Sequence, residues 1–457
     1  MAALLWAQQC PRKDGDAVTA KAFAPTPLLL SRLRFEWSRI PTSRSTLIMV
    51  ITGTVQGWTT VFLPRLKNGT YNNLPFPMTN EEISWIVCLK GIGSIIGRLL
   101  AYNLVHVIGP KNCLLLSCQC FVSGWFLVLS AATLPTMYGA RIILGTGVGI
   151  SNMVYPMYIL EMADGSVREA LTTLSVTSVL FGWLMSFTVG SFVCETTLVK
   201  ILLYASISFI PLLAIFPESP LFLVRKGYVT EACQAMSFFK NTPNLDEAKK
   251  ELVLLIRAHS SNGRKYRFKS GRISNDELRS ITNGNRKRWL KKLSLVLLPN
   301  NIYALYIAFL LITLQHSNGY FCIMEYFLII YEKNMIDANI AMILILTTSL
   351  VFAFYFGITL RNARRRWRVM KSTILCMCVL IIWALDLTFV NRINNSVSVN
   401  NLIIVFAILY QITFQLGLGM IPNVIIDEIF SPELKDVAYI VVMIYDDILY
   451  SASRKYI

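Results

Sequence analysis

The chain has 457 residues, of which 54% are hydrophobic and only 15% are charged, and its mean hydropathy is +0.54. This composition excludes an ordinary soluble protein of this size. The net charge of +17 would suit a nucleic-acid-binding protein, but the excess lies almost entirely in two segments. Residues 221–292 carry 17 Lys and Arg against 6 Asp and Glu, and residues 1–44 carry 7 against 3. Both segments fit the cytoplasmic side of a membrane protein, so we expect no nucleic-acid partner.

Six apolar windows in the first half of the chain are each long enough to cross roughly 30 Å of hydrocarbon. They predict membrane-spanning helices at about 46–63, 83–108, 113–132, 138–160, 170–194 and 198–216. An even number of crossings returns the chain to its starting side, where a basic segment follows. We therefore expect a basic cytoplasmic tail over 1–44, a six-helix bundle over 45–216 and a cytoplasmic loop over 217–292. Short amphipathic helices at the membrane surface are expected in that loop.

Residues 293–457 predict a second bundle of four spans and a partial fifth. The four are expected at about 293–330, 336–360, 374–390 and 401–426, and the first is long enough to be broken near Gln315 to Gly319. The fifth would cover 437–450, but Asp446 and Asp447 inside it would each cost ~2.5 to 3.5 kcal/mol near the bilayer centre. Arg454 and Lys455 also oppose the charge rule on what would be the outer side. We therefore expect an incomplete C-terminal bundle, as in a truncated isoform, an incomplete gene model or a decaying paralogue.

Histidines and cysteines show no catalytic or metal-binding pattern. The chain has three histidines, His106, His259 and His316, and none is spaced with a nucleophile or a metal partner. Most of the ten cysteines lie inside apolar runs, which favours small buried residues over disulfides. The sequence therefore predicts no enzyme, no cofactor and no metal site. The apolar spans also do not predict the continuous polar pore of a channel.

Two glycosylation sequons test the topology independently. Asn68-Gly69-Thr70 and Asn394-Asn395-Ser396 both lie in loops that the charge distribution places outside the cell. We expect glycosylation at Asn68 and Asn394 on that basis, although such tripeptides also arise by chance.

The sixth span ends at Pro217-Glu218-Ser219-Pro220, where two prolines stop the helix before the basic loop. Glu218 between them suits an ion-pair latch to a cationic loop, and the alternative is a solvated charge at a helix end.

The two halves also share a charge pattern. Glu161 precedes Arg168 by seven residues, and Glu428 precedes Lys435 by the same interval. Two bundles related by an axis along the membrane normal would show such a repeat, as would chance recurrence of charges at helix ends.

Three motifs in chain order carry a resemblance to a known family. The run Arg141-Ile-Ile-Leu-Gly-Thr-Gly-Val-Gly149, followed by Pro156, Tyr158, Glu161 and Arg168, is similar to the fourth-span signature of the sugar porter family of the major facilitator superfamily. The motif at 217–220 resembles the one after that family's sixth span. The tenth-span motif is matched by Gly417, Gly419, Pro422, Glu428 and Lys435. Within the family, the chain most resembles the insect facilitated trehalose or glucose transporter-like group, on Ser84-Trp85 and on Gln315, Gly319 and Tyr326.

The resemblance implies a twelve-helix transporter of a hexose or trehalose-like sugar, working by alternating access either down the gradient or with a proton. It also implies candidate substrate-binding positions: Val176, Gln315, His316, Asn318, Phe321 and Asn423. The family carries amides where Val176, His316 and Phe321 stand here, and a tryptophan in place of Asn423. Each lost hydrogen bond is worth ~0.5 to 1.5 kcal/mol. A non-transporting membrane sensor or binding protein, or an inactive truncated paralogue, therefore remains the alternative. His316 would either couple transport to pH or be an ordinary hydrogen-bonded interior residue.

The family also closes its cytoplasmic side with charged residues. The matching residues here are Lys111, Glu161, Arg168, Glu218, Arg365, Arg366, Glu428 and Lys435, and we expect them to form a gating latch that breaks when the inside opens. The family's acidic partners are absent, since His106 and Arg361 stand in their places. We expect a multi-pass protein of the plasma membrane with a cytoplasmic N-terminus, whose partners are a small-molecule sugar and membrane lipids.

Overall fold

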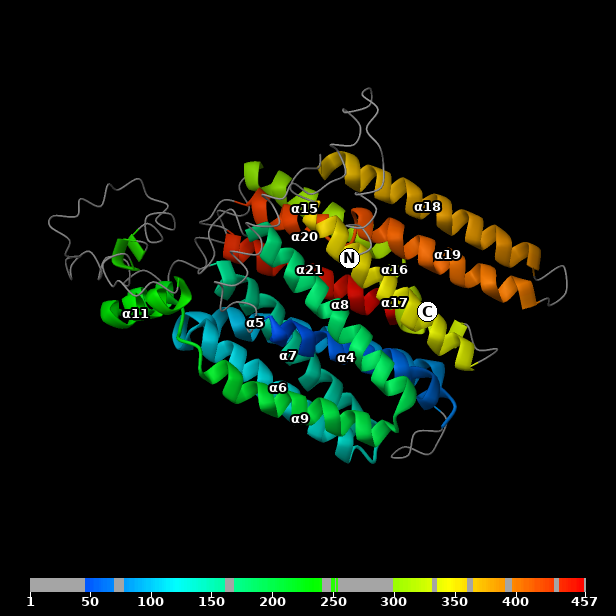
Figure 1. The fold of residues 1–457 in the computed structure, drawn as a ribbon, viewed down its shortest axis with the longest axis horizontal. Coiled ribbons are helices and arrows are strands. Elements are labelled where there is room, and N and C mark those ends of the chain that lie inside the picture. The colour runs from blue at the N-terminus through cyan, green and yellow to red at the C-terminus, as the bar shows by residue number, and fades with distance from the viewer. Residues whose placement is uncertain are drawn as a thin grey trace, which may run out of the picture.

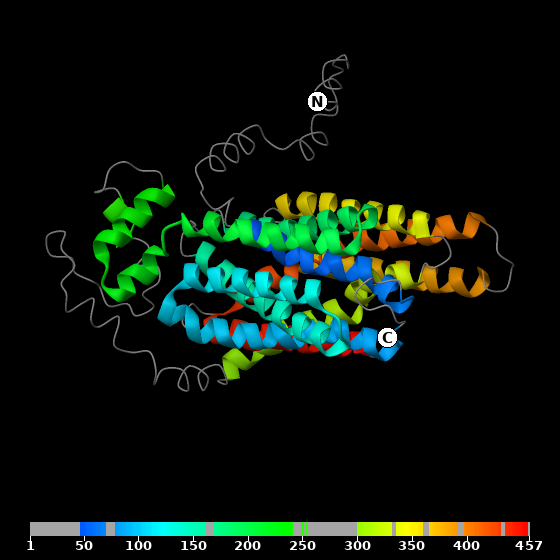
Figure 2. The same ribbon diagram turned by 90° about the horizontal axis from the view of Figure 1, so that it is seen from below.

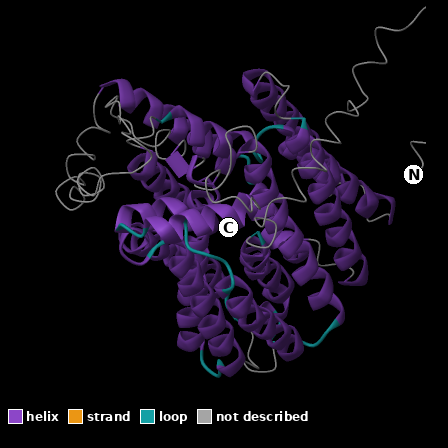
Figure 3. Ribbon diagram, turned by 60° about the vertical axis from the view of Figure 1, so that its left-hand side comes forward, coloured by secondary structure: helices purple, strands orange, loops and turns teal. Residues whose placement is uncertain are grey.

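The structure is a computed structural model, and it describes residues 46–69, 78–160, 168–240, 248–250, 252–253, 299–330, 335–359, 365–390, 397–430 and 435–455. Every regular element in these ranges is an α-helix (Figure 3). The predicted N-terminal tail, most of the basic loop and the sequon at Asn394 lie outside the described residues.

Six long helices form the first bundle, and each lies close to a predicted span. They are α4 (Leu47–Lys67), α5 (Asn80–Ile108), α6 (Pro110–Ser130), α7 (Leu134–Leu160), α8 (Arg168–Phe192) and α9 (Glu195–Ala214). α5 begins three residues before the predicted start because Thr79 and Glu82 form a capping box. The Thr79 backbone N–H donates to the Glu82 carboxylate at 2.8 Å, and the Glu82 N–H donates to the Thr79 hydroxyl at 3.3 Å.

Close helix packing in this bundle depends on glycines. A Cβ atom on Gly53 would overlap the Val179 carbonyl oxygen of α8, and one on Gly57 would overlap the Trp183 carbonyl oxygen. These two glycines therefore let α4 and α8 approach closely. Arg141, which begins the fourth-span motif, is buried in the core of the same bundle. Its Nε donates to the Ile86 carbonyl oxygen at 2.8 Å.

Two short helices follow the first bundle, α10 (Pro220–Lys226) and α11 (Val229–Lys240). They confirm that the basic loop contains helical segments, and they lie at one end of the bundle, on the left in Figures 1 and 2. We call this end the α10 end, and the other the distal end. α4, α6, α8 and α21 begin at the α10 end, and Asn68, the exposed C-cap residue of α4, marks the distal end.

The described residues of the second half form seven helices. They are α15 (Pro299–Ser317), α16 (Tyr320–Ile330), α17 (Met335–Ile358), α18 (Arg365–Val390), α19 (Val397–Leu416), α20 (Ile421–Ile429) and α21 (Lys435–Lys455). α15 with α16 and α19 with α20 form two broken spans. Among the described residues, ten segments are long and apolar enough to cross a membrane, and α21 is not one of them.

The break between α15 and α16 falls where the sequence predicted one. Gly319 adopts a left-handed conformation with φ of 71°, and its N–H donates to the His316 carbonyl oxygen at 2.9 Å. This conformation ends α15 and allows the chain to start α16 in a new direction. The break places Gln315 and His316 on one side and Phe321 on the other.

Among the described residues, three helix pairs make the main contacts between the two bundles. α5 packs against α21, α8 packs against α17, and α4 packs against α16. The long helices run side by side between the α10 end and the distal end (Figure 2). α21 extends beyond the predicted 437–450 at both ends, and it forms a regular 21-residue helix along α5. Because α21 is not among the described segments that are apolar enough to cross a membrane, the predicted count of four spans and a partial fifth stays a prediction.

Candidate substrate cavity

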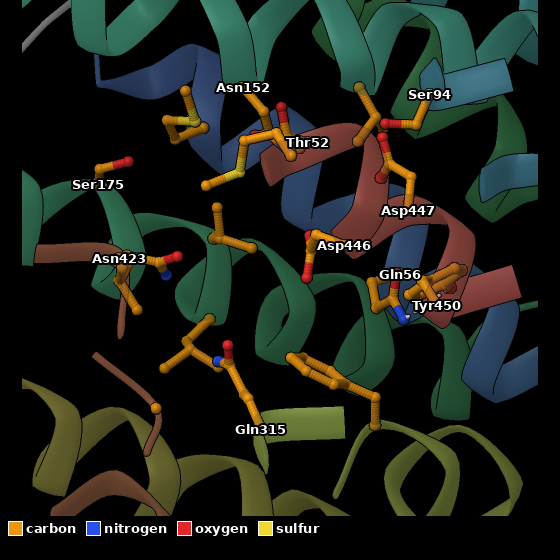
Figure 4. Close-up of a pocket in the computed structure, with 18 of the residues that line it drawn as sticks. Thr52, Gln56, Ser94, Asn152, Ser175, Gln315, Asn423, Asp446, Asp447 and Tyr450 are labelled. Carbon is orange, nitrogen blue, oxygen red and sulfur yellow. Dashed lines mark hydrogen bonds between the residues drawn. The ribbon is translucent and has the colours of Figure 1, made fainter. Parts of the chain in front are cut away.

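A cavity of about 320 Å³ lies between the two bundles (Figure 4). α4, α5, α7 and α8 of the first bundle line it, together with α15, α16, α19, α20 and α21 of the second. Its polar lining is formed by Thr52, Gln56, Lys90, Ser94, Arg98, Asn152, Ser175, Gln315, His316, Gln415, Asn423, Asp446 and Asp447. The apolar lining includes the rings of Trp183, Tyr320 and Phe321. Hydrogen-bonding groups and aromatic faces in one enclosed space are the features of a small-molecule site.

Five of the six candidate substrate-binding residues line this cavity: Val176, Gln315, His316, Phe321 and Asn423. Asn318 is not among the lining residues. Its amide nitrogen donates to the Leu314 carbonyl oxygen at 2.7 Å, and its own carbonyl oxygen accepts a hydrogen bond from the Tyr410 hydroxyl at 2.6 Å. The structure therefore gives Asn318 a place in the α15–α16 break and none on the cavity wall.

Asp446 projects into the middle of the cavity (Figure 4). Its Oδ1 lies 2.8 Å from Nε2 of His316 on α15, and its side chain is 29% exposed. The next residue, Asp447, faces α5 instead. Its two carboxylate oxygens lie 2.6 Å and 3.3 Å from Nε and Nη2 of Arg98.

These contacts correct the expected cost of the two carboxylates in α21. An unpaired charge in the hydrocarbon region is expensive, but a charge that faces the protein interior and has a partner avoids most of that cost. Asp446 has His316 and Asp447 has Arg98. Neither carboxylate is therefore unpaired, and the cost expected for two lone charges does not apply.

A cluster of charged and polar side chains closes the cavity on the side of the distal end. It consists of Gln56, Lys90, Glu325, Tyr450 and Arg454, which we call the distal cluster. Glu325 accepts hydrogen bonds from Arg454 Nε, from the Gln56 amide and from the Tyr450 hydroxyl, the last at 2.6 Å. The Lys90 ammonium lies 4.0 Å from the same carboxylate. Gln56, Lys90 and Tyr450 line the cavity, whereas Glu325 and Arg454 lie behind them with side chains 0% exposed.

The distal cluster also corrects the expectation for Arg454, because this residue is a buried partner of Glu325 and not a free outer charge. The guanidinium lies 3.3 Å from the centroid of the Tyr450 ring, and Nη1 donates to the Tyr450 carbonyl oxygen at 2.8 Å. The cluster joins α4 and α5 of the first bundle to α16 and α21 of the second. It therefore holds the bundles together at this end of the cavity.

The cavity extends from the distal cluster toward the α10 end. Met49 in the first turn of α4, Ile159 in the last turn of α7 and Tyr439 in the second turn of α21 all line it. The described geometry is therefore one in which the distal side is closed by charged contacts and the cavity lies on the α10 side of them.

The predicted gating residues are only partly described. Glu161 lies outside the described residues, and the side chains of Arg168, Glu428 and Lys435 are likewise not described. Arg365 is partly buried and Arg366 is exposed at the start of α18. Whether these residues form a latch therefore stays a prediction.

Glu218 and Lys111 are brought together, but through the backbone. Glu218 Oε1 accepts the backbone N–H of Lys111 at 2.9 Å and that of Ser219 at 3.1 Å. Glu218 therefore binds the first turn of α6, where unpaired amides and the helix dipole favour an anion. Burial raises the pKa of its carboxyl, and these amide hydrogen bonds oppose the shift.

Sequence reasoning missed the charged residues of the cavity wall and the distal cluster. Lys90, Arg98 and Glu325 stand inside predicted apolar spans, and ionisable residues in such positions usually mark a functional site. That signal was present in the sequence. Their charged partners lie between 129 and 349 positions away in the chain, so the sequence did not show which charges would pair.

The two bundles, the broken helices at their interface and the cavity between them define a polytopic helical membrane transporter. The family model "Sugar (and other) transporter" matches residues 45–448, and the chain belongs to that family. Members of the family are transporters and not enzymes.

Similar proteins agree with this class. A facilitated trehalose transporter, Tret1, from Apis mellifera ligustica is 22% identical over 431 residues, covering 94% of this chain and 80% of its own. Tret1 from Bombyx mori is 23% identical over 372 residues, which cover 80% of this chain and 68% of that Tret1. Among solved structures, the proton:xylose symporter XylE bound to a brominated glucose matches with a TM-score of 0.67 at 18% identity, covering 90% of this chain and 87% of XylE. The inward-open form of XylE from E. coli also matches with a TM-score of 0.67 at 16% identity, covering 91% of this chain and 88% of XylE. These structures share the fold.

Proposed function

We propose that this protein carries a hexose or a trehalose-like sugar across the plasma membrane by alternating access. The observation that carries the proposal is the cavity between the bundles, because both bundles supply side chains that can bind a hydroxyl-rich molecule. Asn152 and Ser175 come from the first bundle, and Gln315 and Asn423 come from the second. A substrate held by both bundles would favour their closing around it, which is what alternating access requires.

The chemistry of the lining suits a sugar. Amide side chains both donate and accept hydrogen bonds, and sugar hydroxyls do the same. Asp446 adds a carboxylate that accepts from hydroxyls, and Phe321 offers an aromatic face for the apolar side of a sugar ring. These groups replace part of the hydrogen bonding that the altered positions 176, 316 and 321 would have supplied. Relatives described as trehalose transporters support the same substrate class.

We assign the α10 end to the cytoplasm, together with the N-terminus. The basic residues of 221–292 follow α10 in the sequence, and positively charged loops stay on the cytoplasmic side. The cavity then faces inward and the distal cluster closes the outer side. Arg286 to Arg288 and Lys291 with Lys292, which lie outside the described residues, would contact anionic lipid on the inner leaflet.

Uptake by the purified full-length chain in proteoliposomes tests the proposal. We expect saturable uptake of labelled trehalose or glucose, and exchange of labelled for unlabelled sugar across the membrane. Gln315→Ala and Asn423→Ala should each lower kcat/KM by about 2- to 10-fold, which corresponds to one lost hydrogen bond.

Two matched variants serve as controls, Gln119→Ala and Asn103→Ala, since both residues are exposed on the outside of the first bundle. They should leave uptake unchanged. Uptake that does not saturate, or that equals the leak into empty liposomes for both sugars, would reject sugar transport. It would favour the alternative of a non-transporting membrane sensor, binding protein or inactive paralogue.

A further inference from the structure

The His316–Asp446 pair differs from the other charged contacts around the cavity because its carboxylate is open to the cavity, whereas the His316 side chain is 6% exposed. The Arg98 and Asp447 side chains are 4% and 9% exposed, and Glu325 and Arg454 are fully buried. The Asp446 side chain is 29% exposed, and its second carboxylate oxygen is free of His316. Water that fills the cavity would therefore reach the Asp446 carboxylate of this pair directly.

The pair can hold one additional proton. Within the described residues, Nε2 is the only nitrogen of the His316 ring with a hydrogen-bond partner. When Nε2–H donates to Asp446, Nδ1 remains as an acceptor for a proton from water. The pair then changes from a neutral imidazole beside a carboxylate, with charge −1, to an imidazolium–carboxylate pair with charge 0.

The surrounding charges have partners of their own. The titratable groups on the helices around the His316–Asp446 pair are Lys90 and Arg98 on α5, Tyr320 and Glu325 on α16, and Tyr439, Tyr445, Asp447, Tyr450 and Arg454 on α21 itself. Arg98 is bound to Asp447, and Lys90 and Arg454 share Glu325. The positive charges of Arg98 and Arg454 also act on Asp446. The acidic side chains of α20 are outside the described residues.

We propose that His316 and Asp446 form a proton-binding site that couples sugar movement to proton movement. This inference rests on the proposed sugar transport and adds the coupling ion to it. A sugar bound against Gln315 and Phe321 would lie on the pair, because Gln315 precedes His316 and the Phe321 ring centroid is 5.3 Å from that of His316.

The physical reason for coupling is desolvation. A sugar that covers the pair removes water from it, and so does closure of the two bundles. Removing water from an uncompensated carboxylate costs far more than removing it from a pair whose charges cancel. Sugar binding and occlusion therefore favour the protonated pair, and by linkage the protonated pair binds sugar more tightly. The proton comes from water on one side and returns to water on the other when the sugar leaves.

The test uses proteoliposomes that contain the full-length chain and a trapped pH-sensitive dye. Addition of external trehalose or glucose should acidify the lumen as sugar enters, and an inward proton gradient should accumulate labelled sugar above its outside concentration. His316→Gln and Asp446→Asn should abolish both effects. Exchange of labelled for unlabelled sugar needs no net proton movement, so it should continue in them, slowed by about 2- to 10-fold for each lost contact with the sugar because both residues also line the cavity.

His106→Gln is the matched control, since His106 stands near the α10 end of α5 beside Tyr102 and does not line the cavity. It should keep sugar-driven proton movement. Sugar uptake without acidification and without response to the gradient would overturn the proton site while leaving sugar transport intact. Absence of uptake and of exchange for both sugars would reject the proposed function, and the proton site would fall with it.

Discussion

Arg98 of α5 and Asp447 of α21 form a two-point ion pair across the boundary between the bundles. The Nε–Oδ2 distance is 2.6 Å and the Nη2–Oδ1 distance is 3.3 Å. Both side chains are almost fully buried, and two-point contacts of this kind fix geometry as well as charge. The pair explains how α21, with two acidic residues in its middle, can pack along the apolar helix α5.

Breaking this pair should destabilise the protein. Asp447→Asn leaves the Arg98 guanidinium buried without a counter-charge, and we expect a loss of about 3–5 kcal/mol in the free energy of unfolding. Replacing both residues by leucine should restore most of that loss, because neither charge then remains. Thermal unfolding of the detergent-purified protein measures both effects. A single variant as stable as the original, or a double variant no better than the single one, would contradict the pairing.

The distal cluster should control access from the outer side. Glu325→Gln removes the carboxylate that Lys90 and Arg454 share, so these two cations would repel each other and favour separation of the bundles there. Cys88 is a natural reporter, since it is buried in α5 and its thiol donates to the Ser451 carbonyl oxygen of α21. In a background with Cys88 as the sole cysteine, we expect labelling by an external membrane-impermeant maleimide to accelerate about tenfold.

Glu81→Gln in the same background is the control for that labelling, because it removes an exposed carboxylate from the first turn of α5. It should leave the labelling rate unchanged. Size-exclusion chromatography confirms that each variant is folded before labelling. An unchanged rate in Glu325→Gln would mean that the cluster does not hold the outer side closed.

The sequence predicted the helices well because hydropathy and length are local properties. The break at Gly319 followed from the length of the seventh apolar segment. Charge pairing is not local. Arg98 and Asp447 are 349 positions apart, so no window of the sequence contains both residues of the pair.

The candidate site shows the same difference between properties that are local in the sequence and contacts that are not. Val176 and Asn423 were found by their positions relative to motifs, and both line the cavity. Asn318 lies close to Gln315 and His316 in the chain, but the break between α15 and α16 directs its side chain toward Leu314. From the sequence alone, Asp446 is expected to destabilise a membrane-spanning α21, because its partner His316 lies on another helix. A motif places a residue near a site, whereas its side-chain direction depends on the turn that carries it.

Glu218 gives a prediction about pH. Burial raises the pKa of its carboxyl above the ordinary value of 4.5, although the amides of Lys111 and Ser219 oppose this. The folded state then binds the proton more tightly than the unfolded state, so the contribution of Glu218 to stability falls as the pH rises above 4.5. Glu218→Gln keeps an oxygen for both amides and carries no charge. Its stability relative to the original should therefore increase between pH 4.5 and pH 7.

Thermal unfolding across that pH range checks the Glu218 prediction, with Glu231→Gln as control because Glu231 is exposed on α11. The control should show no such trend. A relative stability of Glu218→Gln that decreases with pH would mean that the amide hydrogen bonds outweigh burial.

Val176 offers a test of substrate recognition, because it lies on the cavity wall next to Ser175 and carries no hydrogen-bonding group. Val176→Gln would place an amide there, and one new hydrogen bond to a sugar hydroxyl should lower the KM for glucose by about 2- to 10-fold. Val176→Leu enlarges the side chain without adding a donor or an acceptor, so it controls for the change in volume. Initial uptake rates over a range of glucose concentrations distinguish the two variants. A KM that rises equally in both variants would mean that any larger side chain at position 176 collides with the bound sugar. Bound sugar would then already fill the cavity up to the Val176 side chain.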